Sequence, residues 1–255
     1  MLVIEQIPVL SDNYVYLVHE PDANLTAVVD PAVTEPVVAA LAEHGWRLTH
    51  ILNTHHHPDH VGGNLELKAA TRCTVVGPRA DRERIPGLDL AVGDGDVFRF
   101  GNSTALVYDV PGHTRGHIAY HFAGDHALFC GDTLFALGCG RMFEGTPPQM
   151  WRSLERLRRL PGDTLVYCAH EYTQSNGRFA LSVEPGNAAL QARMREVDAR
   201  RAQGLPTVPS TLADECATNP FLRPESPELQ TAIGLVGAPL HEVFGATRAR
   251  KDTFR

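Results

Sequence analysis

Short apolar runs separated by turn residues make up most of the first two thirds of the chain. The runs are rich in Val, Ile, Tyr and Phe, and they are bounded by Asp, Asn, Gly and Pro, which is typical of β-strands joined by turns. This pattern predicts strands over residues 2–9, 13–20, 25–32, 48–54, 73–78, 96–101, 103–112, 117–124, 126–132 and 163–170.

Helical periodicity interrupts the strands and then replaces them. Apolar positions three and four residues apart, with Thr, Asn or Pro near the start, are typical of amphipathic helices. Six segments fit this pattern: residues 34–45, 63–71, 146–160, 187–204, 210–217 and 239–254. Beyond residue 170 no strand is predicted. We therefore predict an α/β domain over residues 1–172, followed by an α-helical domain over residues 173–255.

Composition and charge narrow the class of protein. The chain has 255 residues, 43% of them hydrophobic and 21% charged, as in ordinary globular proteins. A net charge of −7 argues against a general nucleic-acid binder. No apolar run reaches the length of about 18 residues that a membrane helix needs, and the start lacks a basic targeting segment. Five cysteines without a C-x-x-C pair predict reduced thiols. We therefore expect a cytoplasmic protein that binds neither nucleic acid nor a membrane.

Four of the predicted strands end in a residue that can bind a metal ion. These residues are His55, His113, Asp132 and His170. Loops at strand ends are where α/β proteins commonly build functional sites. The recurrence therefore suggests that four distant segments contribute to one site.

The densest group of such residues is the stretch THHHPDH, which begins at Thr54. Side chains two residues apart in an extended segment point to the same side, so His55 and His57 can bind one ion while His56 points away. Asp59 and His60 follow a Pro, where the chain turns toward a helix, and can be directed at a second position. A run of core histidines would leave many ring nitrogens unsatisfied, so a purely structural role is disfavoured.

The donor types indicate which kind of metal site this is. Imidazole nitrogen and carboxylate oxygen without thiolate suit a catalytic Zn²⁺, Fe or Mn site better than a closed structural zinc site, which favours Cys. The sequence leaves the choice among these metals open.

The motifs THHHPDH, PGHTRGH, GDTLF and AHEYT resemble the ligand segments of the metallo-β-lactamase superfamily. The resemblance implies an αββα sandwich with two metal ions per chain. It implies that His117 does not bind a metal ion itself and instead supports the ligands or the fold. The implied ligands are His55, His57 and His113 for one ion, Asp59, His60 and His170 for the other, and Asp132 as a bridge between the two.

Four further segments, IPVLSDNYVYLV, GCGRMFEGTPPQM, TNPFLR and RARKDTF, resemble hydroxyacylglutathione hydrolase, the glyoxalase II family. This resemblance implies that the protein hydrolyses S-D-lactoylglutathione to D-lactate and glutathione, the second step of methylglyoxal detoxification. A metal-bridging hydroxide is the expected nucleophile, with Asp59 and Asp132 as catalytic metal ligands. We also expect a monomer. Zinc is the favoured metal. The implied glutathione-binding residues are Arg141, Phe143, Tyr172, Arg248 and Lys251. Some members carry Tyr where this chain has Phe143, so no hydroxyl can bind substrate there.

Three other functions fit the ligand motif. A β-lactamase of the superfamily commonly has Cys where this chain has Asp132, and it lacks a helical second domain of this kind. A sulfur dioxygenase would use a single iron and normally lacks the helical tail as well. A metal-binding protein without activity is the third alternative, but all seven ligand positions are filled. We therefore favour the thioester hydrolase.

Overall fold

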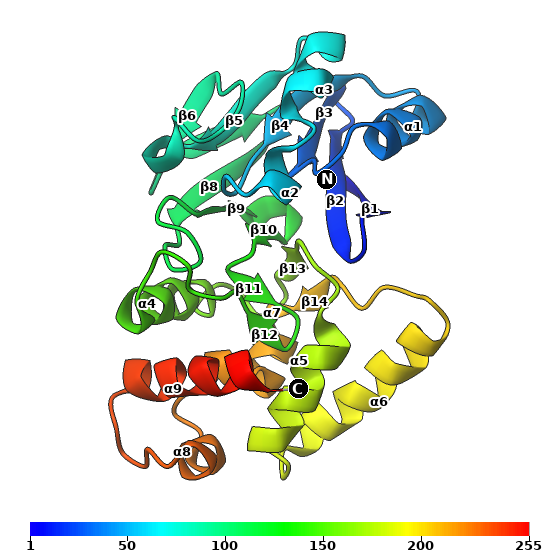
Figure 1. The fold of residues 1–255 in the computed structure, drawn as a ribbon. Helices are drawn as coiled ribbons and strands as arrows, with labels where there is room; N and C mark the ends of the chain where they lie inside the picture. Colours follow the sequence, from blue (N-terminus) through cyan, green and yellow to red (C-terminus); the bar gives the residue numbers. More distant parts are fainter. Residues whose placement is uncertain (255) are drawn as a thin grey trace. The chain divides into compact units, whose positions relative to one another are not determined.

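The computed structural model describes residues 1–254, which form two compact units (Figure 1). The first unit comprises residues 1–109 and 115–131, and the second comprises residues 110–114 and the chain from residue 132 onward. These units do not follow the predicted division at residue 172. No helix among residues 1–254 combines the length and hydrophobicity required to cross a membrane.

The first sheet of the first unit takes its strands in chain order. Its first three strands are antiparallel and the next three pair in parallel. The strands are β1 (Val3–Val9), β2 (Asn13–Glu20), β3 (Leu25–Val29), β4 (Leu48–Leu52), β5 (Thr74–Pro78) and β6 (Leu90–Val92). Parallel pairing places the carboxyl ends of β3 and β4 at one edge of the sheet, with Val29 opposite Leu52. The loops that follow these two strands therefore start side by side.

Two helices cover this sheet through their apolar faces. Val37 and Leu41 of α1 (Glu35–His44) and Leu67 of α3 (Asn64–Thr71) share one buried cluster with the strand residues. The α1 helix ends at Gly45, whose φ of 66° is a left-handed conformation that glycine adopts without a side-chain clash. The sequence predicted this helix and its end correctly.

The second sheet of the first unit is an antiparallel meander. It contains β7 (Val97–Phe100), β8 (Ser103–Asp109), β9 (Ile118–Phe122) and β10 (Ala127–Gly131). The buried Tyr120 hydroxyl donates to the Asn53 carbonyl oxygen at 3.0 Å, which ties this sheet to the chain just after β4.

The second unit is mainly helical. Its strands are the two-residue pairs β11 (Leu134–Phe135) and β12 (Gly138–Cys139), and β13 (Leu165–Cys168) with β14 (Ser210–Thr211). Buried aromatic rings, among them Phe179, Phe221 and Phe244, pack between the helices. The helices are α4 (Pro147–Leu157), α5 (Thr173–Val183), α6 (Ala188–Ala202), α7 (Leu212–Thr218), α8 (Pro227–Ile233) and α9 (Leu240–Thr253).

The pattern of elements confirms most of the predicted strands and helices. The prediction that no strand follows residue 170 was wrong, because Ser210 and Thr211 pair with β13 before α7 begins. The β11–β12 hairpin, α5 and α8 were not predicted. Each of these is short or lacks the apolar periodicity on which the prediction depends.

Candidate metal and substrate site

The chain after β4 brings two predicted metal ligands together. His57 has extended backbone angles (φ −60°, ψ 146°) and is the N-cap of the short helix α2 (Pro58–Val61). The Nε2 atom of His55 lies 3.1 Å from the Nδ1 atom of His57. The two imidazoles therefore converge, as the alternation of an extended segment predicts.

Asp30, directly after β3, orients the ligand histidines. It accepts from the Thr54 backbone N–H at 2.7 Å and from the Thr54 hydroxyl at 2.6 Å. Its carboxylate also lies 3.0 Å from Nδ1 of His60. Because a carboxylate can only accept, His60 donates from Nδ1 and keeps the lone pair of Nε2 for a metal. The Thr54 hydroxyl, 3.1 Å from Nδ1 of His55, similarly leaves Nε2 of His55 available.

Asp30 was missed by the sequence analysis. It is buried and has a φ of 49°, which is unusual for a residue other than glycine. Its carboxylate can share one ion with ring nitrogens of His55 and His60, since one atom from each lies within 4.8 Å of the others. The rule that located the other ligands, an apolar run ending in His or Asp, also applies to the run LTAVVD.

Asp59 and His56 contact different residues. The Asn13 side-chain amide donates to a carboxylate oxygen of Asp59 at 3.0 Å. His56 instead has its Nδ1 atom 3.0 Å from Asp81, and it also contacts Arg84. The side chain of His56 is therefore engaged by an acid that is not in the predicted ligand set.

The two glycines after His60 allow a close backbone contact. A Cβ atom on Gly62 would lie 2.4 Å from the Ala32 carbonyl oxygen, and one on Gly63 would lie 3.1 Å from the Pro31 carbonyl oxygen. Both of these close contacts are with the loop after β3, which carries Asp30.

In the second unit, Asp132 lies between two imidazoles. Nε2 of His113 is 3.4 Å from one carboxylate oxygen, and Nε2 of His170 is 3.5 Å from the other. These separations are long for hydrogen bonds. Two ligand atoms that each lie about 2.0–2.1 Å from one tetrahedral metal ion are themselves about 3.4 Å apart. The arrangement therefore fits a carboxylate that shares one ion with each histidine.

The ring orientation of His113 is fixed by a backbone carbonyl. Nδ1 lies 2.8 Å from the Arg141 carbonyl oxygen, which can only accept, so the proton is on Nδ1 and Nε2 faces Asp132. Phe143 packs its ring edge-on against His113, with the ring centroids 5.2 Å apart. His170 stacks on Tyr172 at 4.7 Å. Aromatic rings thus flank both histidines of this group.

A cavity of about 450 Å³ in the second unit is lined by two residues of this group and by every predicted glutathione-binding residue. Asp132 and His113 line one part of it. The predicted binding residues that line it are Arg141, Phe143, Tyr172, Arg248 and Lys251. A volume of this size is within the range of about 300–1,000 Å³ that is usual for small-molecule sites.

The charges around the cavity favour an anionic ligand. The cavity lining has three cations, Arg141, Arg248 and Lys251, and two acids, Asp132 and Asp252. Asp252 lies 3.0 Å from Arg248 and 3.6 Å from Arg141. Burial lowers the pKa of Lys251, the nearby arginines lower it further, and Asp252 acts in the opposite direction. A cation whose pKa is lowered by its neighbours gains from the arrival of an anion.

Arg248 and Lys251 differ in their surroundings. Arg248 is only 4% exposed, and it donates to the Cys139 carbonyl oxygen at 2.8 Å. Its Nε atom is buried and has no hydrogen-bond partner among residues 1–254. Lys251 lies 3.2 Å from the Ser175 hydroxyl in an exposed contact. Arg248 is therefore part of the cavity wall, whereas the head of Lys251 is accessible.

Two family models together match almost the whole chain. Residues 9–170 match the family model of the metallo-beta-lactamase superfamily, and residues 171–254 match the model described as the hydroxyacylglutathione hydrolase C-terminus. The protein is therefore a metallo-β-lactamase superfamily hydrolase. It is 66% identical over its whole length to a hydroxyacylglutathione hydrolase of Methylococcus capsulatus, and 57% identical over 98% of both chains to one of Rhodospirillum rubrum. The chain belongs to the hydroxyacylglutathione hydrolase family.

Solved structures share the fold. ETHE1 from Myxococcus xanthus superposes with a TM-score of 0.67 at 26% identity, covering 98% of both chains. TTHA1623, solved in a di-iron-bound form, has a TM-score of 0.59 at 25% identity, covering 86% of this chain and all of its own. The predicted fold, a metallo-β-lactamase fold with a C-terminal helical region, and the predicted hydrolase class are thus confirmed.

Proposed function

We propose that this protein hydrolyses S-2-hydroxyacylglutathione, with S-D-lactoylglutathione as its main substrate. Water adds to the thioester carbonyl and the C–S bond breaks, which releases D-lactate and glutathione. The observation that carries the proposal is the cavity of the second unit, where a carboxylate and an imidazole lie beside three cationic side chains. Relatives named hydroxyacylglutathione hydrolase support it, and the reaction is the second step of methylglyoxal detoxification.

The same proposal includes two divalent metal ions. The family resemblance assigns seven ligands: His55, His57, His113, Asp59, His60, His170 and the shared Asp132. Within each unit, the ring orientations and the donor set without thiolate support this assignment. We propose zinc as the metal, with Fe or Mn as alternatives. The di-iron form of TTHA1623 supports two ions. Ions bound there would activate water as the nucleophile, because metal binding can lower the pKa of water from 15.7 to about 7.

The remaining residues bind and orient the substrate. Glutathione carries two carboxylates, which Arg141, Arg248 and Lys251 can neutralise. Phe143 and Tyr172 supply aromatic surface in the cavity lining, against which the glutathione part of the substrate can pack. A thiol with a pKa of about 8.5 can leave as thiolate without a strong general acid, so the site needs no additional protonated carboxyl group.

The first test is hydrolysis of S-D-lactoylglutathione by the purified protein, followed by loss of the thioester absorbance. We expect the rate to follow the metal content of the same sample. Removal of metal with a chelator should lower the rate by at least about 100-fold, because water then loses its activation, and zinc should restore it. A β-lactam should not be hydrolysed. A folded, metal-loaded protein that leaves the thioester intact would disprove the proposal.

Lys251 should give KM a dependence on pH. Because its pKa is lowered from the ordinary 10.5 by burial and by Arg248, Arg178 and Arg141, its charge is lost at a lower pH than that of an exposed lysine. Only the charged form attracts a carboxylate, so KM should rise as the pH rises through the lowered pKa. Initial rates between about pH 7 and 10 would measure this. Lys251→Arg should keep KM constant over this range, and a constant KM in the wild type would contradict the role of Lys251.

We retain the predicted division of the chain into two domains with different roles. Residues 1–172 form the catalytic domain and residues 173–255 the glutathione-binding domain, which is supported by a boundary between the two family models at residues 170 and 171. We also retain a monomer in the cytoplasm. Light scattering of the purified protein should then give a mass close to the 27.9 kDa of one chain.

A further inference from the structure

A short hairpin in the second unit connects a predicted metal ligand with a predicted substrate-binding residue. The strands β11 and β12 pair Leu134 with Cys139, so the hairpin, residues 134–139, lies directly between Asp132 and Arg141 in the chain. Its turn contains Leu137 at a φ of 58°. This left-handed conformation is unfavourable for a residue other than glycine, so surrounding contacts must hold it.

Four buried polar side chains from the helical part hold the hairpin by its backbone. Each bond ends on a different part of it. Asn176 donates to the Ala136 carbonyl at 3.1 Å, Glu215 accepts from the Leu137 N–H at 2.9 Å, Asn219 donates to the Phe135 and Gly138 carbonyls at 3.2 and 2.9 Å, and Arg248 donates to the Cys139 carbonyl at 2.8 Å. All four side chains are at most 6% exposed.

Glu215 is the centre of this arrangement. One of its oxygens accepts from Leu137 and from Asn219, and the other accepts from the Ser210 hydroxyl at 2.6 Å and contacts Arg193. Both oxygens of a fully buried carboxylate are thus used. One oxygen therefore binds the hairpin, and the other faces Arg193, the counter-ion of Glu215.

Packing leaves the hairpin no room to shift. The Leu137 side chain is completely buried in an apolar cluster formed by α5 and α6. A Cβ atom on Gly138 would lie 2.3 Å from the Asn176 amide, and one on Gly140 would lie 2.0 Å from the Asp132 carbonyl oxygen. The backbone that carries Asp132 therefore rests against the chain just after the hairpin.

We propose that Glu215 and Asn219 are positioning residues for the reaction. By fixing the hairpin they hold Asp132 between its two histidines and hold Arg141 at the cavity, so that metal binding and substrate binding depend on one buried carboxylate. This inference rests on the proposed function. It adds a role for the segment TNPFLR, which contains Asn219 and has no residue in the predicted site.

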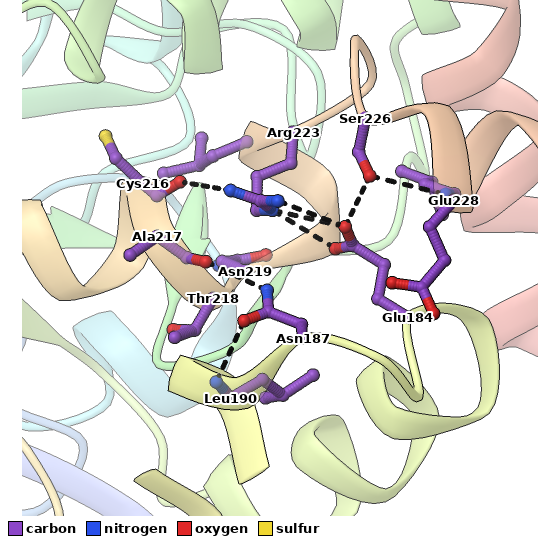
Figure 2. Close-up of polar contacts among 12 residues, drawn as sticks. Glu184, Asn187, Leu190, Cys216, Ala217, Thr218, Asn219, Arg223, Ser226 and Glu228 are labelled. Atoms are coloured by element: carbon purple, nitrogen blue, oxygen red, sulfur yellow. Dashed lines mark hydrogen bonds and ion pairs between the residues drawn. The ribbon is translucent and has the colours of Figure 1, made fainter. Parts of the chain in front are cut away.

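The same unit provides a matched control in Glu184. This residue is also a buried carboxylate, 1% exposed, and it is paired with Arg223 at 3.2 Å and with the Ser226 hydroxyl at 2.6 Å (Figure 2). Arg223 in turn donates to the Cys216 carbonyl oxygen. Figure 2 shows Glu184, at the end of α5, joined to Arg223 and Ser226 in the chain between α7 and α8. Glu184 makes no hydrogen bond to residues 134–139 among the described residues.

The test compares Glu215→Gln with Glu184→Gln. In Glu215→Gln, Arg193 retains the remaining oxygen, so the new NH₂ group points toward the N–H of Leu137 and the amide of Asn219. Both of these groups are donors, and neither keeps an acceptor. In Glu184→Gln, the new NH₂ group is likewise placed beside a donor, Arg223. Both variants should lose a similar amount of thermal stability. Only Glu215→Gln should lose metal ions per chain at a fixed free zinc concentration and lower kcat/KM by about 10- to 100-fold.

Hydrogen exchange gives a readout that does not require activity. In the metal-loaded protein, the amides of residues 134–139 should exchange faster in Glu215→Gln than in the wild type or in Glu184→Gln. Equal metal content, kinetics and exchange in the two variants would overturn the proposal. If Glu215→Gln does not fold, Asn176→Ala, which removes one bond at Ala136, should show the same selective loss to a smaller extent, and wild-type behaviour in that variant would also overturn it. A wild type that binds metal but is inactive on the thioester would disprove only the proposed function.

Discussion

Replacing Asp132 by Asn should lower kcat for thioester hydrolysis by about 10²–10³-fold, the cost typical of removing one group that stabilises charge at a reacting centre. The carboxylate places one oxygen 3.4 Å from His113 and the other 3.5 Å from His170. An amide has the same shape but offers one oxygen and no negative charge. We therefore expect the metal content to fall as well, from two ions per chain to one or fewer.

Asp198→Asn is the matched control for this substitution. Asp198 lies on α6 in the same unit and accepts from the Gln174 side chain in an exposed contact. It should leave metal content and kcat unchanged. Full metal content with wild-type kcat in Asp132→Asn would remove Asp132 from the ligand set. Metal analysis and initial rates on the same preparations separate a loss of ions from a loss of chemistry.

The metal-ligand candidates were visible in the sequence because their spacing is local. Alternation in an extended segment predicts that His55 and His57 converge, and the structure places their ring nitrogens 3.1 Å apart. The same reasoning could not supply the partners that orient them. Asp30 is far from the motif in the chain and reaches His60 only because β3 and β4 pair in parallel. Such a contact follows from topology, which a single sequence does not fix.

The hairpin at residues 134–139 shows a second reason why some elements could not be predicted from the sequence. Its strands are two residues long, and its turn uses Leu137 where turn chemistry favours Gly or Asn. Local preference therefore argues against a turn there. Burial of Leu137 and the hydrogen bond from its N–H to Glu215 override that preference. The information that fixes this turn lies about 80 residues farther along the chain, in α7.

The burial of Arg248 also changes an expectation about substrate binding. On the family resemblance alone, Arg248→Ala and Lys251→Ala should both act mainly on KM, since both residues would bind the peptide part of glutathione. In the structure only Lys251 has an accessible head, whereas Arg248 is 4% exposed and holds the Cys139 carbonyl. Arg248→Ala should therefore change kcat as well as KM, whereas Lys251→Ala should act mainly on KM.

Arg248→Ala should lower kcat/KM by roughly 10²–10³-fold and reduce kcat as well as raising KM, because truncating a buried charged donor removes its hydrogen bonds. The Cys139 carbonyl loses its bond to the guanidinium, and Asp252 keeps only its contact with Arg141. Lys251→Ala should raise KM by about 5- to 20-fold and leave kcat within about twofold. Arg248→Lys keeps the charge but cannot reach both partners with one planar group. Its KM should therefore lie between those of Arg248→Ala and the wild type, and its kcat should stay close to that of Arg248→Ala. If all three variants alter KM alone, Arg248 contributes only charge, and the hairpin does not depend on it.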